Sequence, residues 1–350
     1  MRLRKIPRIL PWRLILTFLE VLMAAVSADV AVEAGLRGSA AGTADAVTSD
    51  VPVIDLQQPE AEVEAAMWAA AHEVGFFTIT GHGIAQELID KAFASSKAFY
   101  AQPQQDKARM SPFSRELNSG YEFYSQVRPS TGTADQKESL QITARQGAMD
   151  GRWPSEPASF ESDANALMSA AHALALRLLS LLERRACPQL APGTLARAHT
   201  LWAADGQCTL RLLHYPPVAA GDTAGLWRAG PHTDWACLTL LFQRPGEAGL
   251  ECAANPRAAD GGAGWARVDP VEGGIAVNIG DMLSRWSGGR LLSNLHRVRM
   301  PTTDEERGRS RYSIAFFAQA DQGQVIETEE KEPITAGDYI LGRIKSNFEK

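Results

Sequence analysis

The spacing of apolar residues divides the chain into a helical first part and a β-rich second part. Residues 59–74 have an apolar side chain every three or four positions, which predicts a helix with one buried face. The residues on that face are Val63, Met67, Ala70 and Val74. The same spacing predicts two further helices, at about 85–100 and at 160–187. Between them, residues 101–157 are rich in proline, glycine, serine and charge, and we expect loops there.

Short β-rich runs bounded by turn residues predict the strands. Two of these runs lie near the start of the folded chain, at 51–56 and at 75–84, and the second ends in a turn. The others follow residue 205, at about 208–214, 236–243, 249–252, 265–268, 275–279, 295–299 and 311–319. Many short strands with turns between them are typical of a sandwich or a barrel. We therefore expect a mainly β fold with a helical N-terminal part.

Composition divides the chain into four segments. They are an N-terminal extension with a linker at 1–50, a helical region at 51–200, a β-domain at 205–321 and a C-terminal helix at 322–350. The last helix is expected to begin at Thr335, with Asp338 three residues on as its N-terminal hydrogen-bonding partner.

The first thirty residues begin basic, become apolar and end in small residues, an outline typical of a secretory or organelle-targeting segment. Arg13 and Glu20 interrupt the apolar run and make it too charged for a membrane span. Met23 can also begin a shorter protein, so a targeting segment and an over-extended start both stay open. We expect a cytoplasmic protein, with targeting through residues 1–30 as the alternative, and a fold that starts near Val51.

The composition is that of a globular protein, with 45% hydrophobic residues, 22% charged residues, a net charge of −6 and a pI near 5.7. The 350 residues suffice for one large core or two modest ones. Lysine and arginine do not cluster in the folded part, so we expect neither a nucleic-acid partner nor a membrane partner for it. The cysteines are scattered, which indicates buried thiols rather than disulfides. They are Cys187, Cys208, Cys237 and Cys252.

His232 and Asp234 lie two residues apart in "PHTDWACLTLLFQ", where we expect a strand. Residues two apart on a strand point to the same face, so both side chains can bind one metal ion, and this donor pair suits Fe(II), Mn(II) or Zn(II). A catalytic metal needs a third ligand, and the other histidines are the candidates: His72, His82, His172, His199, His214 and His296. A jelly roll brings late strands beside earlier ones, which makes His296 the best choice. Two histidines and one carboxylate form the facial triad of non-haem iron oxygenases.

Arg311 and Ser313 are also two residues apart, in the strand-like stretch "RSRYSIAFFAQ". An arginine that points into a β-core is unfavourable unless it meets an anion. Its planar guanidinium suits two-point contact with a carboxylate, and a serine hydroxyl adds a further hydrogen bond. Pairing of Arg311 with a core acidic residue is the structural alternative, and the metal motif upstream favours the binding role.

The sequence resembles the Fe(II)/2-oxoglutarate-dependent oxygenases of the isopenicillin N synthase-like type. The resemblance covers nearly everything from Val51 to about Asp321. The segments that carry it are, in order, "VPVIDL", "GFFTITGHGI", "HTDWACLTLLFQ", "GLEC", "VNIGDMLSRWSGGRLLSNLHRV" and "RYSIAFF". This ordered set is far more specific than any single motif. It implies a double-stranded β-helix, or jelly-roll, core.

Carried over residue by residue, the resemblance makes His232, Asp234 and His296 the iron ligands. It makes Arg311 and Ser313 the pair that binds the distal carboxylate of 2-oxoglutarate.

The segment "LRLLHYPP" departs from the family pattern. Tyr215 matches the tyrosine that contacts the co-substrate, but Leu213 stands where many plant members have asparagine, and His214 replaces the preceding tyrosine. A polar contact near the chelating end of 2-oxoglutarate is therefore missing or replaced. Asp281, in "VNIGD", is expected to belong to a turn and to take no part in catalysis.

The resemblance implies an oxidoreductase that uses Fe(II), O2 and 2-oxoglutarate, with ascorbate as an accessory reductant, and oxidises a small organic substrate with release of succinate and CO2. Hydroxylation is the default outcome, and desaturation or ring closure are its known variations. Two alternatives stay open: an isopenicillin N synthase-like oxidase that uses no 2-oxoglutarate, and a non-catalytic β-domain that binds a metal or a carboxylate. We expect a monomer. The candidates for substrate contact, with packing as the alternative for the aromatic ones, are Gly120, Tyr121, Phe123, Arg211 and Phe316.

Overall fold

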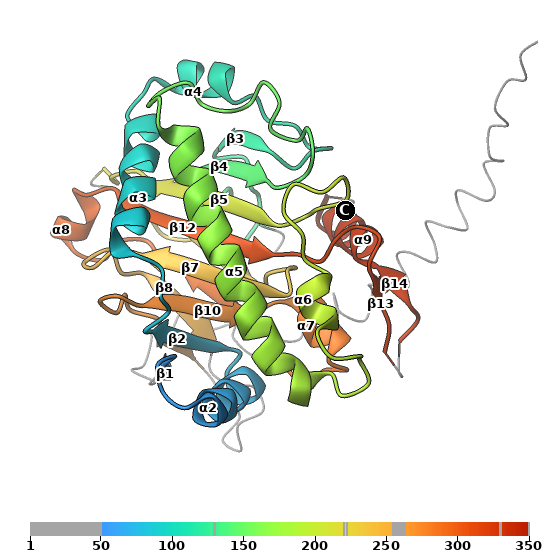
Figure 1. Cartoon of the computed structure of the whole chain (residues 1–350). Coiled ribbons are helices and arrows are strands. Elements are labelled where there is room, and N and C mark those ends of the chain that lie inside the picture. The colour runs from blue at the N-terminus through green and yellow to red at the C-terminus, as the bar shows by residue number, and fades with distance from the viewer. Residues whose placement is uncertain are drawn as a thin grey trace, which may run out of the picture.

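Two stacked β-sheets form the core of the computed structural model, with helices over the outer face of the larger sheet (Figure 1). The structure describes residues 51–128, 131–219, 221, 223–253, 264–328 and 331–348. The expected N-terminal extension and the turn at 254–263 lie outside the described residues. The jelly-roll core expected from the sequence is confirmed.

The larger sheet has eight strands and the smaller sheet has four. In spatial order, the larger one contains β1 (Val53–Asp55), β2 (Phe76–Thr80), β10 (Ile275–Ile279), β7 (Leu238–Gln243), β12 (Arg311–Ala318), β5 (Thr209–Tyr215), β4 (Glu138–Thr143) and β3 (Gly120–Phe123). The smaller one contains β6 (Ala229–His232), β11 (His296–Val298), β8 (Leu250–Ala253) and β9 (Trp265–Arg267). The strands at both edges of the larger sheet come from the N-terminal region, so that region and the β-domain share one sheet.

Strand β12 shows how the larger sheet presents different residues to its two sides. Ile314 and Phe316 pack among the helices, whereas Ala315 and Phe317 pack in the layer between the two sheets. Successive strand residues alternate between the faces, so Arg311 also points into the inter-sheet layer. Both faces are covered, which explains the near-continuous apolar run in the sequence.

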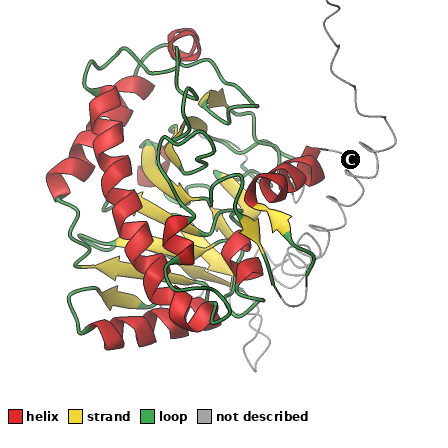
Figure 2. Ribbon diagram, turned by 45° about the vertical axis from the view of Figure 1, so that its right-hand side comes forward, coloured by secondary structure: helices red, strands yellow, loops and turns green. Residues whose placement is uncertain are grey.

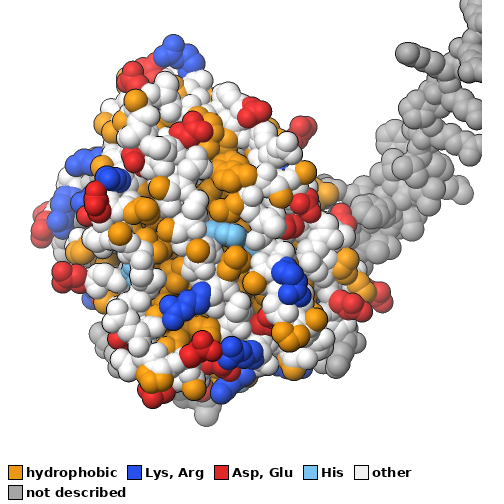
Figure 3. All heavy atoms as spheres, in the orientation of Figure 1, with side chains coloured by type: hydrophobic (Ala, Val, Ile, Leu, Met, Phe, Trp, Pro, Cys, Tyr) orange, Lys and Arg blue, Asp and Glu red, His pale blue; other side chains and the backbone are white. Residues whose placement is uncertain are grey.

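Three long helices cover the outer face: α2 (Glu60–Glu73), α3 (Gln86–Tyr100) and α5 (Phe160–Ala186). Helix α5 crosses the strands of the larger sheet beside α3, and the turned view confirms that the helices form a layer over the strands (Figures 1 and 2). Among the described residues, α5 is the one helix long and apolar enough to span a membrane, but it packs on the sheet as a core helix. On this face of the molecule, acidic and basic side chains are interspersed (Figure 3).

The expectation of loops over residues 101–157 was wrong. This stretch contains α4 (Gln104–Met110), β3 and β4. Strand β4 is buried throughout, although its sequence is polar. Its Glu138 accepts hydrogen bonds from Lys107 and His214, and such partners allow polar residues into a sheet interior. Composition alone does not show those partners, which come from distant parts of the chain.

The C-terminal segment ends in helix α9 (Ala336–Phe348), close to the expected position. The hydroxyl of Thr335 accepts from the amide of Asp338 at 3.1 Å and donates to its carboxylate at 2.7 Å, so the expected N-terminal pairing is confirmed. The remaining elements are short: α6 (Thr194–Arg197), α7 (Asp281–Trp286), α8 (Asp304–Arg307), β13 (Val325–Ile326) and β14 (Ile334–Thr335). All four cysteines are free and buried, as expected.

Deleting residues 1–48 should leave the melting temperature and the activity unchanged. The cut lies before the hydrogen bond from the amide of Thr78 to the carbonyl of Pro52, at 2.7 Å, which ties the chain start to β2. Thermal unfolding followed by circular dichroism compares the two chains. A drop of more than about 2–4 °C, equivalent to roughly 1 kcal/mol in a domain of this size, would show that the extension supports the fold.

Candidate metal centre and co-substrate pocket

The pairing of β6 with β11 brings two of the expected metal ligands together. His232 and His296 are direct partners in this antiparallel pair, and their ring centroids are 4.2 Å apart. Asp234 does not share their strand, because β6 ends at His232 and Asp234 lies in the connection to β7. The expectation that one strand face presents both His232 and Asp234 was therefore wrong, although the three side chains do converge.

The three side chains are close enough to bind one ion. Their ligand atoms all lie within 4.8 Å of one another. The Oδ1 atom of Asp234 is 3.8 Å from Nε2 of His232 and 3.6 Å from Nε2 of His296. Two atoms that each bind a metal at about 2.1 Å can be up to about 4.2 Å apart, so both separations fit. The donor set also fits Fe(II), since two imidazoles and one carboxylate leave coordination positions open.

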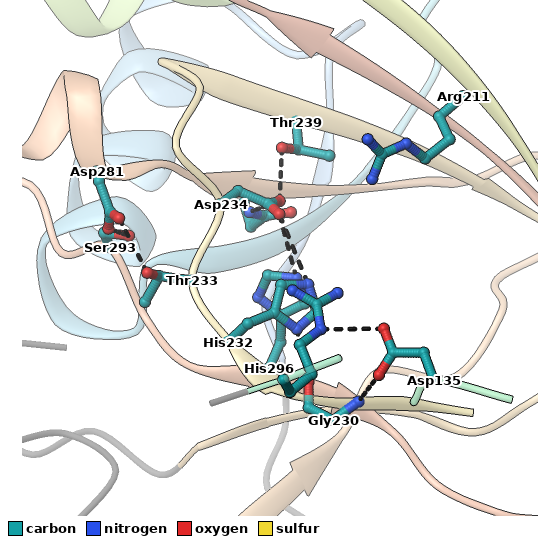
Figure 4. A network of polar contacts seen from close by, with 12 residues as sticks. Asp135, Arg211, Gly230, His232, Thr233, Asp234, Thr239, Asp281, Ser293 and His296 are labelled. Carbon is teal, nitrogen blue, oxygen red and sulfur yellow. Dashed lines mark hydrogen bonds and ion pairs between the residues drawn. The ribbon is translucent and has the colours of Figure 1, made fainter. Parts of the chain in front are cut away.

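Hydrogen bonds behind the ligands fix their orientation (Figure 4). Nδ1 of His232 lies 2.7 Å from the carbonyl of Gly230, which favours a proton on Nδ1 and leaves Nε2 free to bind a metal. The Oδ2 atom of Asp234 accepts from Thr239 at 2.7 Å and from Asn278 at 2.8 Å. Its Oδ1 atom is thereby turned toward the histidines.

Burial keeps both histidines neutral. Desolvation lowers the pKa of His232 well below its ordinary value, and the nearby charge of Arg128 adds to this. Desolvation also lowers the pKa of His296, against an opposing contribution from Asp234. Neutral imidazole is the form that binds a metal ion, so these side chains are in the ligating state at neutral pH.

Asp281 supports the segment that carries Asp234. Its amide donates to the carbonyl of Asp234 at 2.7 Å. Its carboxylate accepts from Thr233 at 2.9 Å and Ser293 at 2.6 Å, and pairs with Arg343 of α9 at 2.8 Å. Asp281 is the first residue of α7, so the expectation that it belongs to a turn was wrong. Its contacts tie both the metal segment and the C-terminal helix to it.

The structure excludes the other five histidines from the triad and gives each a hydrogen bond of its own. His214 points to the opposite face of β5, where Nδ1 lies 2.6 Å from Glu138 and the ring stacks on Tyr312. His82 accepts from the amide of Ile84 at 3.1 Å, as expected for its turn. His72 and His172 lie on helices and His199 before the β-domain, each against a main-chain carbonyl.

Arg311, Ser313 and Tyr215 meet in the layer between the sheets. Arg311 is opposite Tyr215 in the pairing of β12 with β5, and its guanidinium lies 4.9 Å from the tyrosine ring centroid. Arg311 donates to the carbonyl of Glu247 at 2.9 Å and to the side chain of Gln243 at 3.2 Å. Its Nη1 atom and the hydroxyl of Ser313 are buried without a hydrogen-bond partner. Two unpartnered donors on one strand face indicate a site for an anion.

Leu213 lies between these polar groups. It is the strand partner of Ser313 and packs in the inter-sheet hydrophobic cluster. The leucine therefore replaces the usual amide side chain with an apolar contact, and the described residues show no other polar group in its place on β5.

A group of cations lies beside the triad. Arg128 and Lys137 both pair with Asp135, at 3.0 and 2.7 Å, and the same carboxylate accepts from the amide of Gly230 at 2.9 Å. Arg211 extends from β5 toward Asp234 (Figure 4), and its Nε atom donates to Gln141 at 2.5 Å. Burial lowers the pKa of Lys137 to about 8, against the raising effect of Asp135, so this group is mostly charged at neutral pH.

The candidates for substrate contact separate into two groups. Arg211 faces the site. Phe316 and Tyr121 face the helices, so the packing role expected for these aromatic residues is confirmed. The neighbouring Phe317 is the inward residue, 5.5 Å from the guanidinium of Arg211. Gly120 has a φ of 110° and a close contact with the backbone at Pro112, which accounts for the glycine structurally. Phe123 is exposed and packs against Tyr124.

Sequence reasoning missed Thr239, Asn278 and Asp135. Asn278 is a polar residue in the otherwise apolar strand "IAVNI", and this exception was a usable signal. Thr239 and Asp135 gave no such signal, because threonine is common in strands and Asp135 lies in a stretch expected to form loops.

Comparisons with known proteins agree with this geometry. Residues 206–320 match the family model of the 2OG-Fe(II) oxygenase superfamily, and residues 51–160 match that of the non-haem dioxygenase in morphine synthesis N-terminal region. A 2-oxoglutarate-Fe(II) type oxidoreductase of Emericella nidulans, hxnY, is 32% identical over 301 residues, or 78% of this chain and 81% of the relative. The chain belongs to the 2OG-Fe(II) oxygenase superfamily.

Other members are similar over most of their length. The oxygenase is 31% identical to a 2-oxoglutarate-dependent dioxygenase of Aspergillus niger, caaD, over 85% of this chain and 92% of the relative. A Neurospora crassa protein crystallised with alpha-KG and thymine is similar in structure, with a TM-score of 0.72 and 26% identity. The match covers 88% of this chain and 99% of that one. The protein is thus a 2-oxoglutarate-dependent oxygenase, and its non-catalytic alternative is excluded.

Replacing any one of His232, Asp234 and His296 by alanine should abolish Fe(II) binding and turnover. Each loses a ligand from a three-ligand set, while the fold persists because the ligands line the site rather than fill the core. Anaerobic Fe(II) titration and thermal unfolding measure the two effects. His82→Ala is the control, since His82 lies outside the triad and accepts a hydrogen bond from the amide of Ile84. A ligand variant that kept near-normal iron affinity would remove that residue from the triad.

Proposed function

We propose that this oxygenase hydroxylates a small organic substrate, with Fe(II) held by His232, Asp234 and His296. Arg311 and Ser313 bind the distal carboxylate of 2-oxoglutarate. The observation that carries the proposal is the pair of unpartnered buried donors, Nη1 of Arg311 and Oγ of Ser313, in the same inter-sheet layer as the triad. Relatives whose names contain 2-oxoglutarate support this co-substrate over the oxidase alternative.

When bound, Fe(II) supplies the redox chemistry that couples decarboxylation of 2-oxoglutarate to oxidation of the substrate. The protein supplies orientation and a site that excludes water. Thr239 and Asn278 hold Asp234 in one rotamer, and Gly230 holds His232, so the ligand atoms are arranged before the metal arrives. Tyr215 lies against Arg311 and limits the positions that the guanidinium can adopt.

The cations beside the triad favour an anionic substrate. Arg128, Lys137 and Arg211 carry three positive charges, and the buried carboxylate of Asp135 pairs with the first two. Within the described residues, Arg211 forms no ion pair, and its charge interacts with Asp234 across the site. An excess of positive charge in a buried site stabilises a negatively charged ligand more strongly than it would at an exposed surface. A carboxylic acid is the simplest substrate that meets this condition.

Arg311→Gln should raise the dissociation constant of 2-oxoglutarate by about 30- to 1,000-fold. A two-point charge-assisted contact, with the cost of an unpaired carboxylate, is worth roughly 2–4 kcal/mol, and each 1.4 kcal/mol is tenfold. The dissociation constant of Arg311→Lys should lie between those of the wild type and Arg311→Gln, since an ammonium keeps the charge and loses the planar geometry. Ser313→Ala should have a smaller effect, about 1 kcal/mol. Titration of the anaerobic Fe(II) complex gives each constant.

Fe(II) affinity is the internal control, because none of these residues is a metal ligand. Suppose that Arg311→Gln leaves 2-oxoglutarate affinity intact and weakens the organic substrate. The arginine then binds the substrate carboxylate, and the oxidase alternative describes the protein better. Release of succinate in proportion to turnover distinguishes the two enzymes independently.

Matched pairs of a small-ring acid and its primary amide test the charge of the substrate. Phenylacetate, indole-3-acetate and benzoate should perturb the anaerobic Fe(II)–2-oxoglutarate complex at concentrations at least about tenfold lower than their amides do, because the amide lacks the charge. Arg211→Gln should reduce that preference, while Arg184→Gln, on the exposed end of α5, should not. Amides that bind as tightly as the acids would contradict an anionic substrate.

A further inference from the structure

Arg228 is a buried arginine without an anionic partner in the part of the chain that the structure describes. Its side chain is 4% exposed, and its Nε and Nη2 atoms have no hydrogen-bond partner. Among the residues that the structure describes, no carboxylate forms an ion pair with it. A charged group in such surroundings is unfavourable unless a ligand compensates it.

Arg228 lies beside Tyr215 and Arg311, the residues expected to contact 2-oxoglutarate. Its guanidinium lies 5.9 Å from the ring centroid of Tyr215, the ring that also contacts Arg311 at 4.9 Å. Burial lowers the pKa of Arg228 to about 10, and the largest charge effect after burial comes from Arg311. Two guanidinium groups that share one aromatic ring repel each other, and a pKa of about 10 keeps Arg228 protonated at neutral pH.

The nearest acidic residues do not neutralise this pair of arginines. Glu306 also affects the charge of Arg228, but it accepts two hydrogen bonds from Arg299, at 2.8 and 2.9 Å. The charges of Arg311 and Arg228 both act on the pKa of Glu247, but the carboxylate of Glu247 accepts from the amide of Tyr312 at 2.5 Å. Among the described residues there is thus no compensating anion for Arg228, which points to a bound ligand.

We propose that Arg228 is a second carboxylate-binding arginine, which acts with Arg311 on the distal carboxylate of 2-oxoglutarate. The inference rests on the proposed function of Arg311. Arg228 directly precedes β6, whose last residue is His232, so one short segment leads from the proposed carboxylate contact to the metal site.

The test measures the affinity of two keto acids for the anaerobic Fe(II) protein. 2-Oxoglutarate carries the distal carboxylate, and 2-oxopentanoate has a methyl group in its place. Arg228→Gln and Arg228→Met should weaken 2-oxoglutarate at least about tenfold and leave 2-oxopentanoate within about twofold, since only the former has the group that Arg228 binds. Arg228→Lys should restore part of the affinity. Arg184→Gln is the control, an exposed arginine of α5 with its own carboxylate partners, and should not change either constant.

Thermal unfolding without 2-oxoglutarate separates this role from a structural one. Removal of an uncompensated buried charge should keep or raise the melting temperature of Arg228→Met, whereas loss of a structural arginine would lower it. The proposal is overturned if Arg228→Gln binds 2-oxoglutarate within twofold of the wild type, if both keto acids weaken equally, or if Arg228→Met lowers the melting temperature. A wild-type protein that binds no 2-oxoglutarate would instead refute the proposed function itself.

Discussion

The dry layer between the two sheets constrains every polar group in the site. A charge or hydrogen-bonding group that enters this layer must find a partner within it, because water is excluded. Asp234 finds Thr239 and Asn278, and Asp281 finds Thr233 and Arg343. These hydrogen-bonded carboxylates fix the geometry of the metal ligands before any ion is bound.

The same constraint identifies where ligands belong. Donors of Arg311, Ser313 and Arg228 remain without partners, and they lie in one part of the inter-sheet layer. A protein that keeps such groups unsatisfied is less stable without its ligand than an apolar variant would be. The function that we propose explains that arrangement, because the missing partner is then an anion that the enzyme binds and releases in each cycle.

Charge also differs between the parts of the site. Two histidines made neutral by burial and one carboxylate surround the metal position, while cations extend from it along β5 and the segment before β4. Asp135 connects the cations with the metal position. It pairs with Arg128 and accepts from the amide of Gly230, and the carbonyl of Gly230 lies against His232. Changes in the substrate-side charges therefore reach the metal ligands through one strand.

The sequence by itself determined the strands of the jelly roll, the three ligands and the Arg311–Ser313 pair, because ordered motifs and apolar periodicity are local properties of the chain. The sequence also predicted that Thr335 pairs with Asp338 at the start of the last helix, because the two residues are only three positions apart. The sequence did not distinguish Phe316 from Phe317, because an apolar strand covered on both sides has no polar face that reveals which residue points inward.

Only the tertiary structure decided which distant groups meet. Pairing of β6 with β11 placed His232 opposite His296, and the turn after β6 rather than strand alternation delivered Asp234. The polar strand β4 is buried because α4 and β5 supply hydrogen-bonding partners for it. Arg228 is identified as a candidate ligand-binding residue because two of its nitrogen atoms have no such partner. Compensation of buried charge depends on contacts between residues far apart in the chain, and for that physical reason no local pattern of residues predicts it.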